Sequence, residues 1–158
     1  MNLKILRLTL RSDSPMRGDG AKLRGFFATS FNEYAPLHQH NTDKLIYRYP
    51  LIQYKMINGN PLVLGIDEGA EVLKEIYDKF DKIRLGESSY TIMEREVTVK
   101  SEEFGCTDGI LSYRFMSPWI ALSQENYAKY VAASEEERRD LLRRILVGNI
   151  LSASKGLG

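Results

Sequence analysis

The sequence predicts an α+β fold, and three observations predict it. Several segments of the first 106 residues alternate apolar and polar side chains, which is the period of a strand. Two other segments repeat apolar residues at intervals of three and four, which is the period of a helix. The segments follow one another in the order strand, helix, strand, strand, helix, strand. This order is the split βαβ arrangement of a ferredoxin-like fold, which we expect for a domain over residues 1–106.

The first half of this pattern covers residues 3–55. Residues 3–10 are apolar with the strand period and are expected to be buried on at least one face. Residues 21–34 are predicted to be helical because Leu23 and the phenylalanines after it recur at three and four, and Pro36 is expected to end the helix. Residues 45–55, LIYRYPLIQYK, are predicted to form a strand.

The second half completes the fold with a hairpin, a helix and a last strand. The sequence NGN at residues 58–60 predicts a tight turn into a strand over residues 61–66. Residues 69–80 have the helical period, and residues 90–100, YTIMEREVTVK, alternate and are rich in β-branched residues.

Residues 107–158 are expected to form a partial second ferredoxin-like domain, consisting of its opening strand and helix. Residues 110–122 are strand-like with a break at Pro118, and a long helix is predicted from about residue 135 to 154. Ser134 and Glu137 have the spacing of a capping box. We expect the apolar stripe of this helix to pack on the first domain, on another chain, or on residues beyond these; it comprises Leu141, Leu142, Ile145, Leu146, Ile150 and Leu151.

Composition indicates a globular protein of the cytoplasm. The 158 residues are 43% hydrophobic and 27% charged, which is ordinary for a folded domain. The single Cys106 excludes a disulfide framework and favours a reducing compartment. The opening MNLKILRLTL has no unbroken apolar region, so no signal peptide is expected, and no apolar run is long enough to cross a membrane.

Charge is unevenly distributed along the chain. The net charge is +1, but residues 1–60 carry nine lysines and arginines against four acidic residues. Residues 61–140 carry ten against 17. Because a polyanion responds to a local patch, the basic first part remains able to bind nucleic acid.

The only two histidines, His38 and His40, lie together in LHQH just after Pro36. In an extended segment this spacing puts both rings on one face. Imidazole titrates near neutral pH, so two of them suit a paired general acid and base. Two other interpretations stay open: a solvated loop, and a metal site that would need carboxylates, because Cys106 is the only thiol.

Five segments together resemble a known family: KLRGFFATSF (22–31), LHQH (37–40), LIYRYPLIQYK (45–55), GIDEGAEVLKEIYD (65–78) and GNILSASKGLG (148–158). They are similar to the b-type CRISPR repeat-processing endoribonucleases of the RAMP superfamily. The resemblance implies tandem ferredoxin-like domains and metal-independent cleavage of precursor CRISPR RNA within repeats, with no cofactor. Family members usually continue into a second domain with a glycine-rich loop, of which we expect only the opening strand and helix here.

Metal-free cleavage of RNA uses the adjacent 2′-hydroxyl as nucleophile and leaves a 2′,3′-cyclic phosphate and a 5′-hydroxyl. We assign His40 as the general base. His38 is its partner, either as the general acid or as the residue that orients it, although the sequence does not fix which histidine is the base. Tyr47 is the candidate for a hydrogen bond to the phosphate or the 2′-hydroxyl. The candidate RNA-binding residues are Lys22, Arg24, Arg48, Tyr49 and Lys55.

The sequence is also compatible with a second function class. In this alternative, the chain is a non-catalytic protein of the same fold that binds repeat RNA or has an architectural role. The tyrosines of residues 45–55 then serve strand packing, and Lys22 and Arg24 form a solvated helix face. In either class the expected partner is CRISPR repeat RNA. A homodimer through the helix at 134–154, or through core left exposed by absent second-domain strands, is a further candidate.

Overall fold

The computed structural model describes residues 1–37, 40–41, 44–45, 49–115, 119 and 122–158. The chain divides into two units, Met1–Cys106 and Thr107–Gly158.

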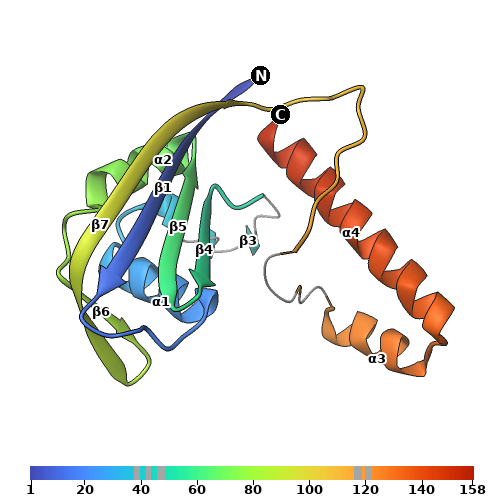
Figure 1. Ribbon diagram of the computed structural model, residues 1–158, viewed down its shortest axis with the longest axis horizontal. Coiled ribbons are helices and arrows are strands. Elements are labelled where there is room, and N and C mark those ends of the chain that lie inside the picture. The colour runs from blue at the N-terminus through green and yellow to red at the C-terminus, as the bar shows by residue number, and fades with distance from the viewer. Residues whose placement is uncertain (38–39, 42–43, 46–48, 116–118, 120–121) are drawn as a thin grey trace. The chain divides into compact units, whose positions relative to one another are not determined.

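Strand β1 (Asn2–Ser12) lies at the centre of the sheet in the first unit. It pairs antiparallel with β5 (Asn60–Ile66) on one side and with β7 (Ser88–Glu103) on the other. At the two edges, β4 (Ile52–Ile57) pairs with β5 and β6 (Lys82–Leu85) pairs with β7, which gives the order β4-β5-β1-β7-β6 (Figure 1). The hairpin β4–β5 thus lies on one side of β1 and β7 on the other, as in a split βαβ unit. The predicted α+β class is confirmed.

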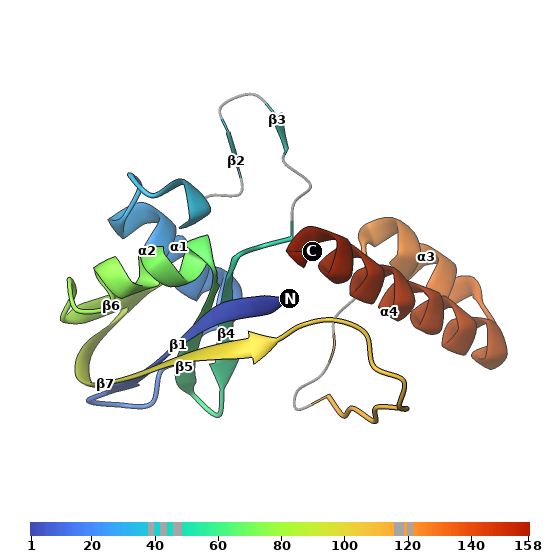
Figure 2. The same ribbon diagram turned by 90° about the horizontal axis from the view of Figure 1, so that it is seen from above.

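Helices α1 (Gly20–Ser30) and α2 (Glu68–Ile76) cover one face of this sheet, as Figure 2 shows. Leu6, Leu8 and Leu10 of β1 share that face and are buried, because residues two apart in a strand point the same way. They join a core that also contains Leu23, Phe27, Leu73 and Ile76 from the helices. The alternation seen in the sequence therefore corresponds to a sheet with one helix-covered face.

The β4–β5 hairpin turns where the sequence predicts it. Asn58 and Gly59 have φ angles of 52° and 77°, and Ile57 pairs with Asn60, so both central residues take the positive φ that a two-residue hairpin turn of type I′ requires. The predicted strand over residues 45–55 is not continuous, because residues 49–51 are irregular and β4 begins at Ile52, while residues 46–48 lie outside the described residues. Pro50 lacks a backbone N–H and cannot donate to a sheet, which accounts for the break.

Both predicted helices end earlier than their periodicity indicated. Helix α1 stops at Ser30, and a short 3-10 helix, η1 (Ala35–Leu37), follows instead of a continuous helix to residue 34. Thr29, Ser30 and Asn32 are weak helix formers, so the apolar period alone does not sustain the helix. Helix α2 stops at Ile76, and Phe80 reaches the core from the turn that follows. The four-residue β6 was not predicted.

The second unit contains two helices among its described residues. Helix α4 (Glu135–Leu157) begins at the predicted capping box, in which Ser134 accepts from the backbone N–H of Glu137 and the Glu137 side chain accepts from that of Ser134. This helix is confirmed. Helix α3 (Gln124–Ala132), capped by Ser123, was not predicted.

The predicted strand over residues 110–122 is wrong for residues 110–115, which are irregular, and residues 116–118 and 120–121 lie outside the described part. Ile110 and Tyr113 are 100% and 87% exposed. Alternation produces a strand only where a neighbouring strand accepts its hydrogen bonds, and these residues have none within the described ranges. Where the structure describes it, the second unit is therefore helical and does not begin with a strand.

The stripe of α4 is covered in part by α3, a possibility that the sequence prediction did not include. Leu142 lies with Tyr127 and Tyr130 of α3 around one hollow. Ile150 and Leu151, further along α4, are more than half exposed. Among the described residues, no helix combines the length and apolar character needed to cross a membrane.

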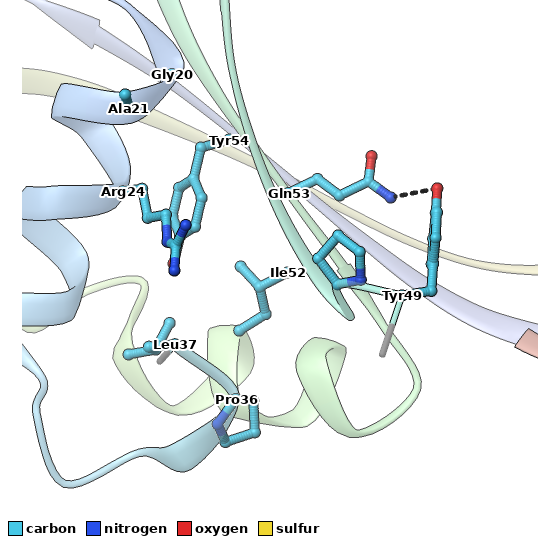
Figure 3. A pocket seen from close by; sticks show the side chains of 10 residues that line it. Gly20, Ala21, Arg24, Pro36, Leu37, Tyr49, Ile52, Gln53 and Tyr54 are labelled. Carbon is cyan, nitrogen blue, oxygen red and sulfur yellow. Dashed lines mark hydrogen bonds between the residues drawn. The ribbon is translucent and has the colours of Figure 1, made fainter. Parts of the chain in front are cut away.

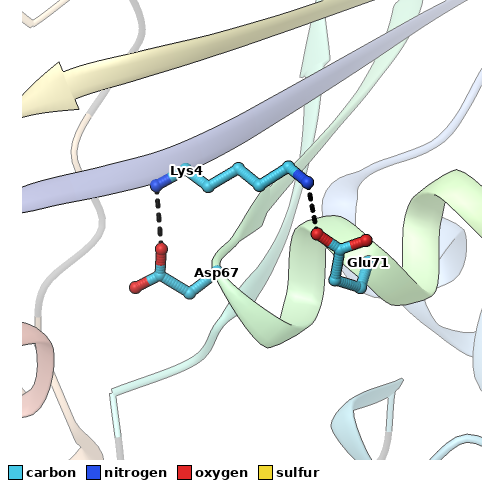
Figure 4. Close-up of polar contacts among 3 residues, drawn as sticks. All are labelled: Lys4, Asp67 and Glu71. Carbon is cyan, nitrogen blue, oxygen red and sulfur yellow. Dashed lines mark hydrogen bonds and ion pairs between the residues drawn. The ribbon is translucent and has the colours of Figure 1, made fainter.

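Asp67 and Lys4 tie the start of α2 to β1 (Figure 4). The backbone N–H of Lys4 donates to the Asp67 carboxylate at 2.8 Å, and the Asp67 N–H donates to the Lys4 carbonyl at 2.8 Å. The Lys4 ammonium also pairs with Glu71 one turn into α2. This hydrogen bond and the charge of Lys4 hold the pKa of Glu71 below its ordinary value.

We predict that Gly65→Ala destabilises the protein, because a Cβ at this position in β5 would lie 2.5 Å from the Gly69 carbonyl oxygen of α2. Overpacking of this kind costs about 1–3 kcal/mol of unfolding free energy. Gly25→Ala is the matched control, because a Cβ there meets nothing within 4 Å in α1. It is expected to stabilise by about 0.5–1 kcal/mol. Urea unfolding measures both, and equal effects of the two changes would refute the close approach of β5 and α2.

We predict that Lys4→Met raises the pKa of Glu71 toward its ordinary value, because Lys4 is the main cause of the lowering. A carboxyl whose folded pKa is lowered stabilises the fold above its unfolded pKa, and this contribution is lost as pH falls through the folded pKa. Carbon-13 NMR titration of the Glu71 carboxyl measures the shift. Lys74→Met is the control, because Lys74 is the weaker of the two cationic influences, and an equal shift in both variants would contradict the assignment.

Candidate active site

A pocket of about 410 Å³ lies between α1 and β4, at the edge of the sheet (Figure 3). Three segments form it: the first turn and a half of α1, the short helix η1, and the chain from residue 49 into β4. Its lining residues are Gly20, Ala21, Arg24, Pro36, Leu37, Tyr49, Pro50, Ile52, Gln53 and Tyr54.

The start of α1 is fixed against β4 by a cap and a glycine. Asp19 caps the helix by accepting a hydrogen bond from the backbone N–H of Lys22 at 2.8 Å. Gly20 lies so close to β4 that a Cβ would be 2.5 Å from the Tyr54 carbonyl oxygen. Since Arg24 follows Gly20 by four residues, the helix places both on the same face, toward Tyr54.

The inner wall of the pocket is apolar and belongs to the core. Leu37 is 1% exposed and Ile52 is 4% exposed. The ring of Tyr54 packs on Phe27 of α1 with its centroid 5.6 Å away. The pocket therefore has a rigid floor, because these side chains are held by packing on both sides.

Two polar features lie on the pocket walls. The Gln53 side-chain N–H donates to the Tyr49 hydroxyl at 2.9 Å. The Tyr54 hydroxyl is buried and has no hydrogen-bond partner among the described residues. Burial raises the pKa of Tyr54 far above its ordinary value, although the charge of Arg24 acts in the opposite direction. Tyr54 is thus a neutral phenol at physiological pH, with an unused donor and acceptor.

The pocket adjoins both ends of the segment that carries the histidines. In the sequence, Leu37 immediately precedes His38, and Tyr49 immediately follows Arg48. Within this segment the backbone of β2 (His40–Asn41) pairs with β3 (Lys44–Leu45), so the backbone of His40 is extended. His38, Tyr47 and Arg48 lie outside the described residues, as does the side chain of His40.

The structure brings together only some of the residues predicted to bind RNA. Arg24 and Tyr49 both line the pocket. Tyr49 is not in a strand as predicted, because it precedes Pro50 in an irregular stretch. Lys22 lies on another side of α1, beside the β6–β7 turn, where a Cβ on Gly86 would be 3.9 Å from its Nζ. Lys55 is exposed on β4 and does not line the pocket.

The sequence pattern did not indicate Gln53 or Tyr54 as pocket residues. Strand packing accounts for the ring of Tyr54, which packs on Phe27, but not for its buried hydroxyl, which has no hydrogen-bond partner among the described residues. The one signal in the sequence is the QYK triplet, in which three polar-tipped side chains stand in an otherwise apolar strand.

Within the described ranges, no cluster of three or more His, Cys, Asp or Glu residues is arranged to hold a metal ion. Cys106 is a free, exposed thiol.

The first unit is thus an α+β domain of split βαβ topology, with a partly polar pocket at the base of a histidine-bearing segment. Residues 1–103 match the Cas6b N-terminal domain, and residues 105–158 match the Cas6b C-terminal domain. The chain therefore belongs to the Cas6b family.

Two solved structures are similar over the whole chain. One, "Crystal structure of Cas6b", is 35% identical with a TM-score of 0.86, and this chain covers 73% of it. The other, "Crystal structure of CRISPR RNA processing endoribonuclease Cas6b", is 34% identical with a TM-score of 0.70 and is covered to 70%. Uncharacterized protein MJ0978 of Methanocaldococcus jannaschii is 42% identical over 83 residues, which are 52% of this chain and 56% of that protein. The matched part is thus little more than half of that relative.

We predict that Tyr54→Phe increases the unfolding free energy by about 1 kcal/mol, because it removes a buried hydroxyl that has no partner among the described residues. Tyr90→Phe is the matched control. The Tyr90 hydroxyl accepts from the backbone N–H of Arg17 at 2.9 Å, so its removal is expected to cost about 1 kcal/mol. Urea unfolding of both variants tests this, and a loss of stability in Tyr54→Phe would show that its hydroxyl is hydrogen-bonded.

Proposed function

We propose that this chain is a metal-independent endoribonuclease that cleaves precursor CRISPR RNA within its repeats. Membership of the Cas6b family supports the reaction class, as does the 34% identity to a CRISPR RNA processing endoribonuclease. The structural observation that carries the proposal is the pocket with Arg24 and Tyr49, from which the chain leads into the segment of His38 and His40. This arrangement supports RNA binding beside a pair of imidazoles.

The proposed reaction needs two proton transfers and no external nucleophile. His40 removes the proton from the 2′-hydroxyl, whose oxygen forms a bond to the adjacent phosphorus. The bond from phosphorus to the 5′-oxygen breaks, and His38 donates a proton to that leaving oxygen, or the two histidines have the opposite order. Tyr47 hydrogen-bonds the phosphate as negative charge develops. The products are a 2′,3′-cyclic phosphate and a 5′-hydroxyl.

The cationic side chains divide into two proposed roles. Arg24 lies in the pocket and contacts the RNA next to the cleavage site. Lys22, Arg48 and Lys55 contact phosphates further along the strand, where their charges strengthen binding without selecting sequence. Binding through such contacts weakens as salt rises.

The domain roles follow from the same proposal. Residues 1–106 carry the catalytic residues, and residues 107–158 extend the RNA-binding surface. Val147, Ile150 and Leu151 are exposed apolar residues on α4, and they support pairing of two chains through this helix. The reduced Cys106 is consistent with action in the cytoplasm.

We predict that replacing both His38 and His40 by Ala lowers the cleavage rate by about 10²–10⁴-fold for each proton transfer lost, while RNA affinity changes little. The measurement is incubation of the full chain with repeat RNA from its own source in a chelator, followed by analysis of the end groups. A 2′,3′-cyclic phosphate is the expected product end.

Retained RNA binding with no cleavage by the intact protein would overturn the proposal in favour of a non-catalytic repeat-RNA-binding protein. Cleavage that is lost in chelator and restored by added divalent metal would replace the proposed mechanism by a metal-dependent one.

A further inference from the structure

The pocket between α1 and β4 has the lining of a site for a flat, uncharged ring. Its floor is the buried pair Leu37 and Ile52, and two prolines, Pro36 and Pro50, add rigid apolar walls. Its volume of about 410 Å³ lies in the range of small-molecule sites, about 300–1,000 Å³. Unpaired RNA bases are recognised by such apolar surfaces bordered by a few polar groups.

The charge of the lining argues against a phosphate site. Among the described residues that line the pocket, Arg24 is the single charged one. Phosphate sites gather several donors around one anion, whereas the described lining offers one cationic side chain next to apolar groups such as Ile52 and Pro36. A base that rests on Ile52 and meets Arg24 at one edge fits this lining better than a phosphate does.

The polar groups stand at opposite sides of the floor. Figure 3 shows Arg24 and Tyr54 on one side of Ile52, and the hydrogen-bonded pair of Gln53 and Tyr49 on the other. The guanidinium has only donors, so the base edge beside it must present acceptors. The Gln53 amide nitrogen already donates to Tyr49, which leaves its carbonyl oxygen as an acceptor at the opposite side.

Guanine matches this polarity. Its O6 and N7 are adjacent acceptors that take two hydrogen bonds from one arginine, and its N2 amino donor lies on the opposite edge. Adenine presents its N6 donor where guanine has O6, which would face the donors of Arg24. The neutral Tyr54 hydroxyl beside Arg24 has no hydrogen-bond partner among the described residues and is a second group able to form a hydrogen bond when a base enters.

We propose that this pocket binds one unpaired guanine of the RNA substrate and that Arg24 determines the preference for it. This inference rests on the proposed function, because that proposal identifies RNA as the substrate. It adds a sequence-selecting residue and two further contact residues, Gln53 and Tyr54, to the candidate site.

Binding of the four nucleoside 5′-monophosphates to the intact chain tests the proposal without any cleavage. All four carry the same phosphate, so differences report the base. We expect guanosine monophosphate to bind about tenfold more tightly than adenosine monophosphate, with shifts of the Arg24 side-chain N–H signal in nitrogen-15 NMR. Inorganic phosphate at the same concentration is expected not to displace it.

Arg24→Lys is the decisive variant, because lysine keeps the positive charge but cannot form the bidentate hydrogen bonds of a guanidinium group. It should reduce the preference for guanosine over adenosine monophosphate to about twofold or less, while Arg84→Lys, at the other edge of the sheet, should leave it unchanged. Equal binding of all four nucleotides, displacement by phosphate, or unchanged preference in Arg24→Lys would each overturn the inference. Because none of these measurements needs cleavage, their failure is distinguishable from failure of the proposed nuclease function.

Discussion

Phe27 is the side chain on which both the fold and the pocket depend. It is fully buried at the centre of an aromatic cluster, with ring centroids 5.4 Å from Phe26, 5.4 Å from Phe80 and 5.6 Å from Tyr54. These contacts hold α1 against the sheet and at the same time fix the ring of Tyr54. Since Arg24 precedes Phe27 by one turn on the same helix, the packing that buries Phe27 also determines where the guanidinium lies.

The edge position of β4 explains why a pocket exists there. A central strand such as β1 is hydrogen-bonded on both sides, whereas the pairing of β4 among the described residues is with β5 alone. Pro50, which has no backbone N–H to donate, ends sheet pairing just before β4. The close approach of Gly20 to the Tyr54 carbonyl then brings the start of α1 over this edge. Binding groups from distant parts of the sequence meet because of these two constraints.

The proposed site separates binding from proton transfer. Arg24 and Tyr49 belong to elements that pack on the core, and rigid elements position binding groups more accurately than loops do. The histidines belong to the connecting segment between η1 and β4. The excess basic charge of the first 60 residues is not all available to RNA, because Lys4, Arg7 and Arg11 form ion pairs with Glu71, Glu96 and Glu94. Arg24 is the cation among the described residues that line the pocket.

The sequence by itself determined the α+β class, the hairpin at Asn58 and Gly59, and the capping box at Ser134, because these depend on local periodicity, turn chemistry and caps. It also indicated Arg24 and the histidine pair as functional. Only the tertiary structure decided that β4 begins at Ile52, that residues 110–115 are not a strand, and that Arg24 lines one pocket with Tyr54 and Gln53 while Lys22 does not. The reason is physical: a strand needs a partner to accept its hydrogen bonds, and a pocket needs side chains that only long-range packing brings together.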